Sequence, residues 1–198
     1  MITPDVDASR LVEIAAAAVR GGADVIQLRH KTMARGELLA VARRLRAVTA
    51  DAGRLLVVND HLDVALMSGA DGVHLGPDDL SVEAARRVAG ATLLIGASAS
   101  TPTAATAAVA AGADYLGCGP AFATPIKAEK EVIGPAGIAE VAAAVGADVP
   151  VFAIGGIDES NAGRLLDLGL MRFCVIRAVG DAKAPEAATR RLRAMLDP

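Results

Sequence analysis

The chain has 198 residues, a net charge of −3 and 53% hydrophobic residues, with three Phe, one Tyr and no Trp. This composition is typical of a globular enzyme with a single domain, residues 1–198, and an aliphatic core. The acidic balance and the lack of long basic runs argue against general binding of nucleic acids or membrane surfaces, and no apolar run approaches the roughly 18 residues of a membrane span. Because the N-terminus lacks a signal-peptide pattern, we expect a cytoplasmic protein.

A Gly-Ala-Asp triplet occurs four times, each time after a helix-like segment and before a β-branched or aromatic run. Glycine commonly ends a helix in the left-handed conformation, after which the chain becomes extended. We therefore interpret the triplets as helix-to-strand turns and their aspartates as turn formers. The triplets begin at Gly22, Gly69, Gly112 and Gly146. Strands that alternate with helices in this way predict a parallel sheet.

In chain order, the pattern predicts seven strands and eight helices. The strands are short and mostly apolar, at 25–29, 55–59, 72–75, 93–97, 115–119, 151–154 and 173–176. The helices are predicted at 9–20, 35–52, 62–68, 82–89, 102–111, 135–145, 161–168 and 185–196. Such strands favour an α/β fold of the (β/α)8 TIM-barrel class. Its first strand would be residues 1–3, so that strand is short or incomplete.

The first clear strand ends in polar and basic residues. Since alternate residues of a strand share a face, Gln27, Arg29 and Lys31 are expected to point the same way. Two fixed positive charges and an amide at one strand end favour an anionic ligand such as a phosphate. The alternative is a strand tip whose charges are merely solvated.

The next strand ends also carry polar residues, which in a barrel lie on one rim. Asp60 and Asp79 follow two neighbouring strands, and such a pair suits Mg²⁺, which takes one or two carboxylates and keeps several waters. The alternative is that Asp60 caps the helix after it and that Asp78 and Asp79 cap the helix after Leu80. Ser98 ends the following strand.

The longest loop, residues 120–133, contains Thr124 and Lys127 and is interpreted as a substrate lid. The next strand ends in Gly155 and Gly156, whose backbone N–H groups are open to close approach by a phosphate. In barrels, the phosphate site commonly uses the loops after the seventh and eighth strands. Here these are the glycine pair and the turn at residues 176–177.

Six short motifs therefore occur in order at the strand ends, over nearly the whole chain. They are 27–31 (QLRHK), 59–60 (ND), 72–76 (GVHLG) with Asp79, 96–98 (GAS), 119–120 (GP) with Phe122, Thr124 and Lys127, and 154–157 (IGGI). Together they resemble the thiamine-phosphate synthase and thiazole tautomerase superfamily, and most closely its synthase branch. The resemblance implies a (β/α)8 barrel that joins hydroxymethylpyrimidine diphosphate to thiazole phosphate and releases diphosphate, in thiamine biosynthesis.

The resemblance also implies roles for single residues. Mg²⁺ would be held by Asp60 and Asp79, and the diphosphate would be bound by Gln27, Arg29, Lys31, Asn59 and Lys127. Arg29, Lys31 and Lys127 would be catalytic, because they stabilise the leaving group. Ser98 would contact the pyrimidine diphosphate and Thr124 the thiazole phosphate. The amides of Gly156 and of Ile176 and Arg177 would complete a phosphate cup.

Three residues depart from the family pattern, namely Pro77, Ile126 and Arg177. They leave two alternatives open, a thiazole tautomerase and a non-catalytic barrel that binds a phosphorylated thiazole. The tautomerase branch carries a histidine where this chain has Pro120 and lacks the two carboxylates, which favours the synthase. Cys118 and Cys174 lie in apolar runs and are expected to be buried thiols. The oligomeric state stays open, and a homo-oligomer is one alternative.

Overall fold

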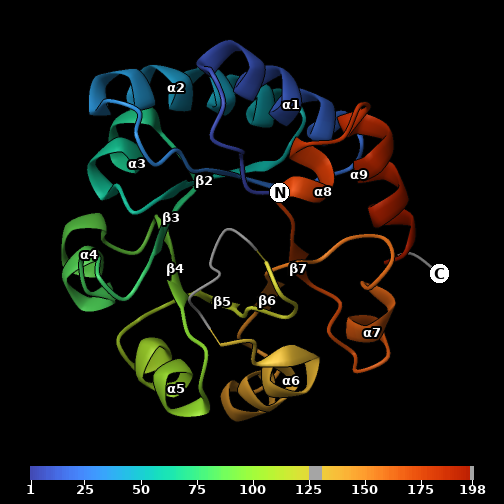
Figure 1. The fold of residues 1–198 in the computed structure, drawn as a ribbon. Helices are drawn as coiled ribbons and strands as arrows, with labels where there is room; N and C mark the ends of the chain where they lie inside the picture. The colour runs from blue at the N-terminus through green and yellow to red at the C-terminus, as the bar shows by residue number, and fades with distance from the viewer. Residues whose placement is uncertain (125–130, 197–198) are drawn as a thin grey trace. The chain divides into compact units, whose positions relative to one another are not determined.

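The computed structural model describes residues 1–124 and 131–196. It divides into two compact units, one of Met1–His74 with Ile176–Pro198 and one of Leu75–Val175. In each unit, strands alternate with helices, and every strand pairs in parallel with its neighbour along the chain (Figure 1). No helix in the described ranges is long and apolar enough to cross a membrane.

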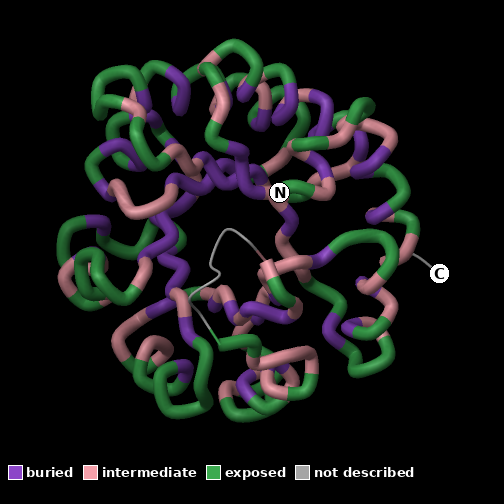
Figure 2. Tube along the Cα trace, viewed as in Figure 1, coloured by how far each residue is buried: buried purple, intermediate pink, exposed green. Residues whose placement is uncertain are grey.

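The first unit contains the first three strands and the helices around them. Its elements are α1 (Ala8–Arg20), β1 (Val25–Leu28), α2 (Arg35–Asp51), β2 (Leu55–Asn59), α3 (Leu62–Ser68), β3 (Gly72–Leu75, whose last residue begins the second unit), α8 (Arg177–Gly180) and α9 (Pro185–Ala194). Leu28 pairs with Val58, and Val58 pairs with Val73. These three side chains are fully buried, and Figure 2 shows that buried residues follow the strands of this unit.

The expected short first strand exists as a single bridge beside β1. Ile2 forms an isolated parallel bridge with Gln27. Gln27 donates its N–H to Met1 O at 2.8 Å and accepts the Thr3 N–H at 2.9 Å. After this bridge, Asp7 begins α1 by accepting the Arg10 N–H at 3.0 Å, which satisfies one of the free N–H groups of the first turn.

The second unit contains the remaining elements. They are α4 (Val82–Ala89), β4 (Leu94–Ser98), α5 (Pro102–Ala110), β5 (Tyr115–Cys118), α6 (Gly134–Val145), β6 (Val151–Ile154), α7 (Gly163–Leu166) and β7 (Phe173–Cys174). Ala97 pairs with Leu116 and Cys118 with Ala153, and these four residues are at most 5% exposed. Pro102 and Pro135 stand in the first turns of α5 and α6, where the missing N–H has no helical partner to lose.

Two of the four Gly-Ala-Asp aspartates, Asp71 and Asp114, have structural roles, which they fill through their side chains. Asp71 Oδ2 accepts the Leu56 N–H at 2.8 Å and pairs with Arg46 at 3.2 Å. In the second unit, Asp114 Oδ2 accepts the Ile95 N–H at 2.7 Å and pairs with Arg86. Each carboxylate therefore ties the amino end of its own strand to the amino end of the preceding strand in sequence.

The largest differences from the predicted elements occur near the end of the chain. The helix predicted at 161–168 is only Gly163–Leu166, and the strand predicted at 173–176 is only Phe173–Cys174. Ile176 has φ −114° and ψ −75° and lies at the N-cap of α8, a helix that the sequence pattern did not predict. The apolar run from Phe173 to Ile176 therefore spans a strand and the start of a helix.

Candidate functional site

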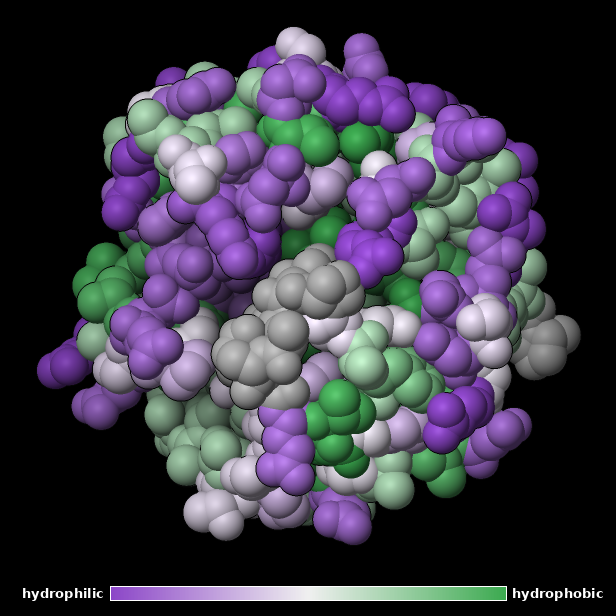
Figure 3. Space-filling model, in the orientation of Figure 1, coloured by the Kyte–Doolittle hydropathy of each residue, from purple (hydrophilic) through white to green (hydrophobic). Residues whose placement is uncertain are grey.

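In the first unit, polar residues lie at one level across three strand ends. Asn59 pairs with His74, and Arg29 directly follows Leu28, which pairs with Val58, the residue before Asn59. Gln27 lies on β1, two residues before Arg29, and is only 8% exposed. Figure 3 shows hydrophilic residues gathered over β2 and β3 on this face of the unit. These strand ends therefore join cationic, amide and imidazole groups in one row.

The N-terminal segment holds Arg29 and Lys31 in place. Thr3 Oγ1 donates to Arg29 O at 2.8 Å and accepts the Arg29 N–H at 2.9 Å. Asp5 pairs with Arg29 Nη1 at 3.3 Å and accepts the Lys31 N–H at 2.8 Å. Because β1 ends at Leu28, Lys31 lies beyond the strand, where the two-residue alternation used to predict its direction no longer applies.

His30, which lies between the two basic residues, has a structural role. Its Nδ1 accepts the Met33 N–H at 3.0 Å, so its proton lies on Nε2, which donates to Val6 O at 3.1 Å. Both ring nitrogens are therefore engaged with the backbone, and His30 is not available as a general base in this arrangement.

Asp60 has an unusual backbone conformation at the end of β2. It is the one non-glycine residue with a positive φ, 64°, in the described part of the chain. Its N–H donates to His74 O at 2.8 Å, which ties it to the end of β3. The N-cap of α3 is His61, without a side-chain capping bond, so the alternative that Asp60 caps this helix is wrong. Left-handed aspartates are strained and concentrate at functional sites.

Asp79, in the second unit, is likewise not a helix cap. Ser81 begins α4 by accepting the Ala84 N–H at 3.2 Å, so the capping alternative for Asp78 and Asp79 is wrong. Asp79 Oδ2 instead accepts the Gly76 N–H at 2.7 Å. This bond orients the exposed carboxylate and leaves its other oxygen for a ligand.

Two loops at the carboxyl ends of β5 and β6 are bonded to each other. Ala121 donates its N–H to Ile154 O at 2.8 Å, and Phe122 donates its N–H to Gly155 O at 3.0 Å. Gly156 has φ 65°, and a Cβ there would lie 2.6 Å from Ala123 O, so only glycine fits. Glycine is therefore required here by the close packing of the chain's own loop, and phosphate binding by the Gly156 N–H stays a prediction.

The sequence analysis missed two residues that support these loops. Asn161 Nδ2 donates to Gly156 O at 2.8 Å, and its Oδ1 accepts the Asp158 N–H at 3.0 Å. The Arg164 guanidinium lies over the Phe122 ring, 5.1 Å from its centre. The sequence holds a signal for Asn161 alone, because an Asp-x-x-Asn spacing permits a local side-chain turn.

The other predicted site residues have less distinctive surroundings. Ser98 ends β4, level with Gly117, and Thr124 is half-buried. Ile176 precedes α8, and the exposed Arg177 pairs with Asp181 at 3.3 Å, one turn further on. Lys127 and Ile126 lie outside the described residues.

The two cysteines and the tyrosine of the second unit are not suited to nucleophilic or acid–base chemistry at neutral pH. Burial raises the pKa of Cys118 to about 11 and also raises the pKa of Cys174. Burial raises the pKa of Tyr115 as well, and its ring packs edge-on against Phe152 with 5.6 Å between centroids. The prediction that the cysteines are buried thiols is confirmed for Cys118, and the Cys174 thiol is buried although the residue is partly exposed.

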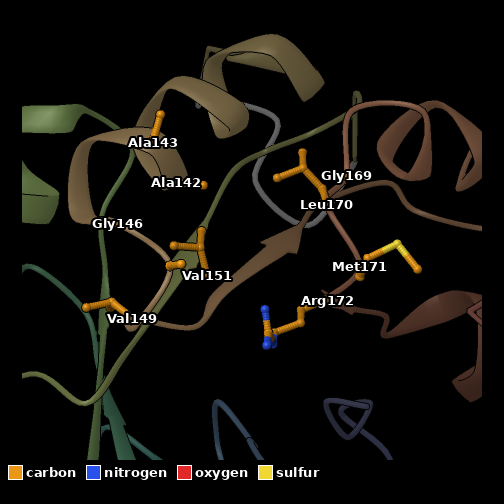
Figure 4. A pocket seen from close by; sticks show the side chains of 10 residues that line it. Ala142, Ala143, Gly146, Val149, Val151, Gly169, Leu170, Met171 and Arg172 are labelled. Carbon is orange, nitrogen blue, oxygen red and sulfur yellow. The ribbon is translucent and has the colours of Figure 1, made fainter.

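The second unit also contains a pocket of about 380 Å³ near the amino ends of β6 and β7, with a lining of mixed polarity (Figure 4). Val149 and Val151 line it from β6 and the turn before it, and Leu170, Met171 and Arg172 from the segment before β7. None of the predicted site residues lines this pocket. Functional residues of barrels lie at the carboxyl ends of the strands, so the pocket is separate from the predicted site.

Two carboxylates follow strand ends, Asp60 in the first unit and Asp79 in the second, and each offers the type of oxygen donor that magnesium prefers. No cluster of three His, Cys, Asp or Glu side chains suited to a metal is found in residues 1–124 and 131–196. Magnesium does not require one, because it takes one or two carboxylates and completes its shell with water and phosphate oxygens. Asp60 and Asp79 are hard oxygen donors, and neither serves as a helix cap.

Comparison with known proteins reveals relatives along almost the entire chain. Residues 1–179 match the family model described as thiamine monophosphate synthase. The thiamine-phosphate synthase of Salinibacter ruber is 46% identical over 186 residues, 93% of this chain and 81% of that protein. That of Chlorobium luteolum is 44% identical over 197 residues, 99% of this chain and 92% of that protein.

Solved structures give the fold. A thiamine phosphate pyrophosphorylase from Pyrococcus furiosus matches with a TM-score of 0.89 and 38% identity, over 99% of this chain and 93% of that one. A 3-hexulose-6-phosphate synthase matches with a TM-score of 0.75 and 20% identity, over 98% of each chain, and shows the fold alone. The predicted α/β fold of the TIM-barrel class is confirmed, and the single-domain organisation stays a prediction.

Proposed function

Because the chain belongs to the thiamine monophosphate synthase family, we propose that it joins hydroxymethylpyrimidine diphosphate to thiazole phosphate and releases diphosphate. It is then a transferase of thiamine biosynthesis, and we propose that it acts in the cytoplasm. The observation that carries this proposal is the 46% identity over 93% of the chain to a thiamine-phosphate synthase. The partners are the two phosphorylated precursors.

The central task is to stabilise the leaving diphosphate. In the family reaction, the bond between the pyrimidine methylene carbon and the diphosphate oxygen breaks first, and the thiazole nitrogen then captures the carbocation. We assign Arg29, Lys31 and Lys127 to this task as catalytic donors, with Gln27 and Asn59 as further hydrogen-bond donors to the phosphate oxygens. The level row of polar strand ends in the first unit supports the assignment of Arg29 and Asn59.

We assign Asp60 and Asp79 to a magnesium ion. A bound Mg²⁺ would neutralise charge on the diphosphate and so lower the barrier to its departure. The chain's own contribution is to present two carboxylates on residues that are not the N-caps of the following helices. The backbone supports this at both positions, through the left-handed conformation of Asp60 and the Gly76 N–H bond of Asp79.

The remaining residues are assigned to the organic parts of the substrates. Ser98 is proposed to contact the pyrimidine diphosphate and Thr124 the thiazole phosphate. The backbone amides of Gly156, Ile176 and Arg177 are proposed to bind the thiazole phosphate oxygens, and Arg177 supplies a guanidinium where the family commonly has serine. The scheme needs no covalent nucleophile, which agrees with the raised pKa of both cysteine thiols.

The experiment is a thiochrome fluorescence assay for thiamine phosphate, with both precursors and with Mg²⁺ present or chelated. We expect product that disappears on chelation and in Asp79→Asn. Product formation that survives chelation would contradict the metal assignment. No product from the wild-type protein would overturn the synthase proposal and favour a tautomerase or a binding protein, which need no metal.

The tautomerase alternative loses support at one residue. Its branch carries a histidine in the lid strand region, and this chain has Pro120 there, joined to Gly119 by a cis peptide bond. The curated relatives named above are synthases. We therefore keep the synthase as the proposed function.

A further inference from the structure

We propose that Asp5 is a positioning residue for diphosphate, which acts by fixing the Arg29 guanidinium and the backbone at Lys31. This inference rests on the proposed function, since it concerns the anion that Arg29 is assigned to bind. Asp5 comes from the segment before α1, where neither the sequence motifs nor the family resemblance assigns a role.

The contacts of Asp5 join the two basic residues. One carboxylate oxygen, Oδ2, lies 3.3 Å from Arg29 Nη1, and the other, Oδ1, accepts the Lys31 N–H at 2.8 Å. One side chain thus fixes both the direction of a guanidinium and the path of the chain two residues later. The Asp5 side chain is 40% exposed and that of Arg29 only 18% exposed, so the pair lies at the edge of the unit's interior.

The same segment fixes the backbone of Arg29. Thr3 is fully buried, and its hydroxyl both donates to Arg29 O and accepts the Arg29 N–H. Since Thr3 fixes the main chain and Asp5 the side chain, little of the conformational freedom of Arg29 remains to be lost on binding. Immobilising a long side chain costs affinity, so an arginine that is already ordered binds an anion more tightly.

A single carboxylate contact also leaves Arg29 able to bind a phosphate. A guanidinium carries five N–H donors in a fixed fork, and Asp5 engages Nη1. The opposing effect is the repulsion between the Asp5 carboxylate and a diphosphate, which the partial exposure of Asp5 weakens by solvent screening. Ordering of Arg29 strengthens pyrophosphate binding, and charge repulsion weakens it. The pyrophosphate affinity of Asp5 variants therefore shows which of the two effects is larger.

The test measures binding of inorganic pyrophosphate with Mg²⁺ by calorimetry, and kcat and KM for both substrates. We expect Asp5→Ala to weaken pyrophosphate binding about tenfold and to lower kcat, while the KM for thiazole phosphate stays unchanged. Asp5→Asn keeps an acceptor for the Lys31 N–H, so its pyrophosphate affinity should fall only about threefold. In an Arg29→Ala background, Asp5→Ala should weaken pyrophosphate binding only about threefold, because the bond to the Lys31 N–H is then the one Asp5 contact left to lose.

Asp7→Ala is the matched control, because Asp7 caps α1 from the same segment and touches neither basic residue. It should lower the melting temperature and leave pyrophosphate affinity unchanged. Unchanged or tighter binding in Asp5→Ala, or an equal loss in the Arg29→Ala background, would overturn the inference. A wild-type protein that makes no thiamine phosphate would instead overturn the proposed function, and the pyrophosphate series would still test Asp5.

Discussion

Arg86 is expected to be the most costly charged side chain to remove from the second unit. Its guanidinium donates to Gly90 O, Leu93 O and Gly112 O, each at 2.9 Å, and pairs with Asp114. The side chain is 25% exposed, so solvent compensates only partly for these bonds. Hydrogen bonds to charged groups contribute about 1.5–3 kcal/mol each when well formed. After allowance for water reaching the freed carbonyls, we expect Arg86→Ala to cost about 3 kcal/mol.

For a chain of this length, 3 kcal/mol corresponds to a fall in melting temperature of about 6–12 °C. The assay is thermal unfolding followed by circular dichroism, with urea unfolding as a second measure. Arg86→Lys keeps the charge but not the planar fork, and should recover less than half of the loss.

The neighbouring Arg87 provides a control, because it is exposed on the same helix and the same substitution should cost less than about 0.5 kcal/mol. An Arg86→Ala protein that melts within 2 °C of Arg87→Ala, on the scale of about 2–4 °C per kcal/mol, would refute the reasoning. It would mean that the four interactions of Arg86 are replaced by water at no cost.

Three further results are expected. Asp79→Asn should lower thiamine phosphate formation on the order of 10²-fold or more, with no change in melting temperature beyond about 2 °C, measured by the thiochrome assay and circular dichroism. Gly156→Ala should destabilise the protein by about 2 kcal/mol or more in urea unfolding, because φ is 65° and the new Cβ would meet Ala123 O at 2.6 Å. Burial raises the pKa of Cys118 to about 11, so at pH 8 the thiol stays protonated in the folded state; iodoacetamide should label it only after denaturation, as mass spectrometry can show.

The sequence predicted most elements closely because their ends are marked by glycine, proline or serine. The predicted helices 62–68 and 82–89 agree with α3 and α4 to the residue, and Gly69 and Gly90 end them with positive φ. Where no such signal stands, the prediction failed. The apolar run before Arg177 contains no break, and its division between β7 and α8 follows from the backbone at Ile176 alone.

The site was only partly predictable, for a related reason. Strand-end residues such as Asn59 and Asp60 follow from the strand pattern. Asp5 and Asn161 do not, because their partners lie elsewhere in the fold or in a local turn that no strand pattern marks. The two capping alternatives were reasonable from sequence, since aspartate is a good N-cap, and only the observed caps His61 and Ser81 exclude them.

The aspartates at the two ends of the strands have different partners, which supports a role in stability at the amino ends and the proposed role in metal binding at the carboxyl ends. At the amino ends, Asp71 and Asp114 each accept a backbone N–H from the preceding strand in sequence and pair with an arginine. At the carboxyl ends, neither Asp60 nor Asp79 is the N-cap of the helix that follows, and Asp60 has a left-handed backbone conformation. Evolution retains such strain where the side chain has a task other than folding. Variants of Arg86 should therefore change the melting temperature without changing kcat, and variants of Asp79 should do the reverse.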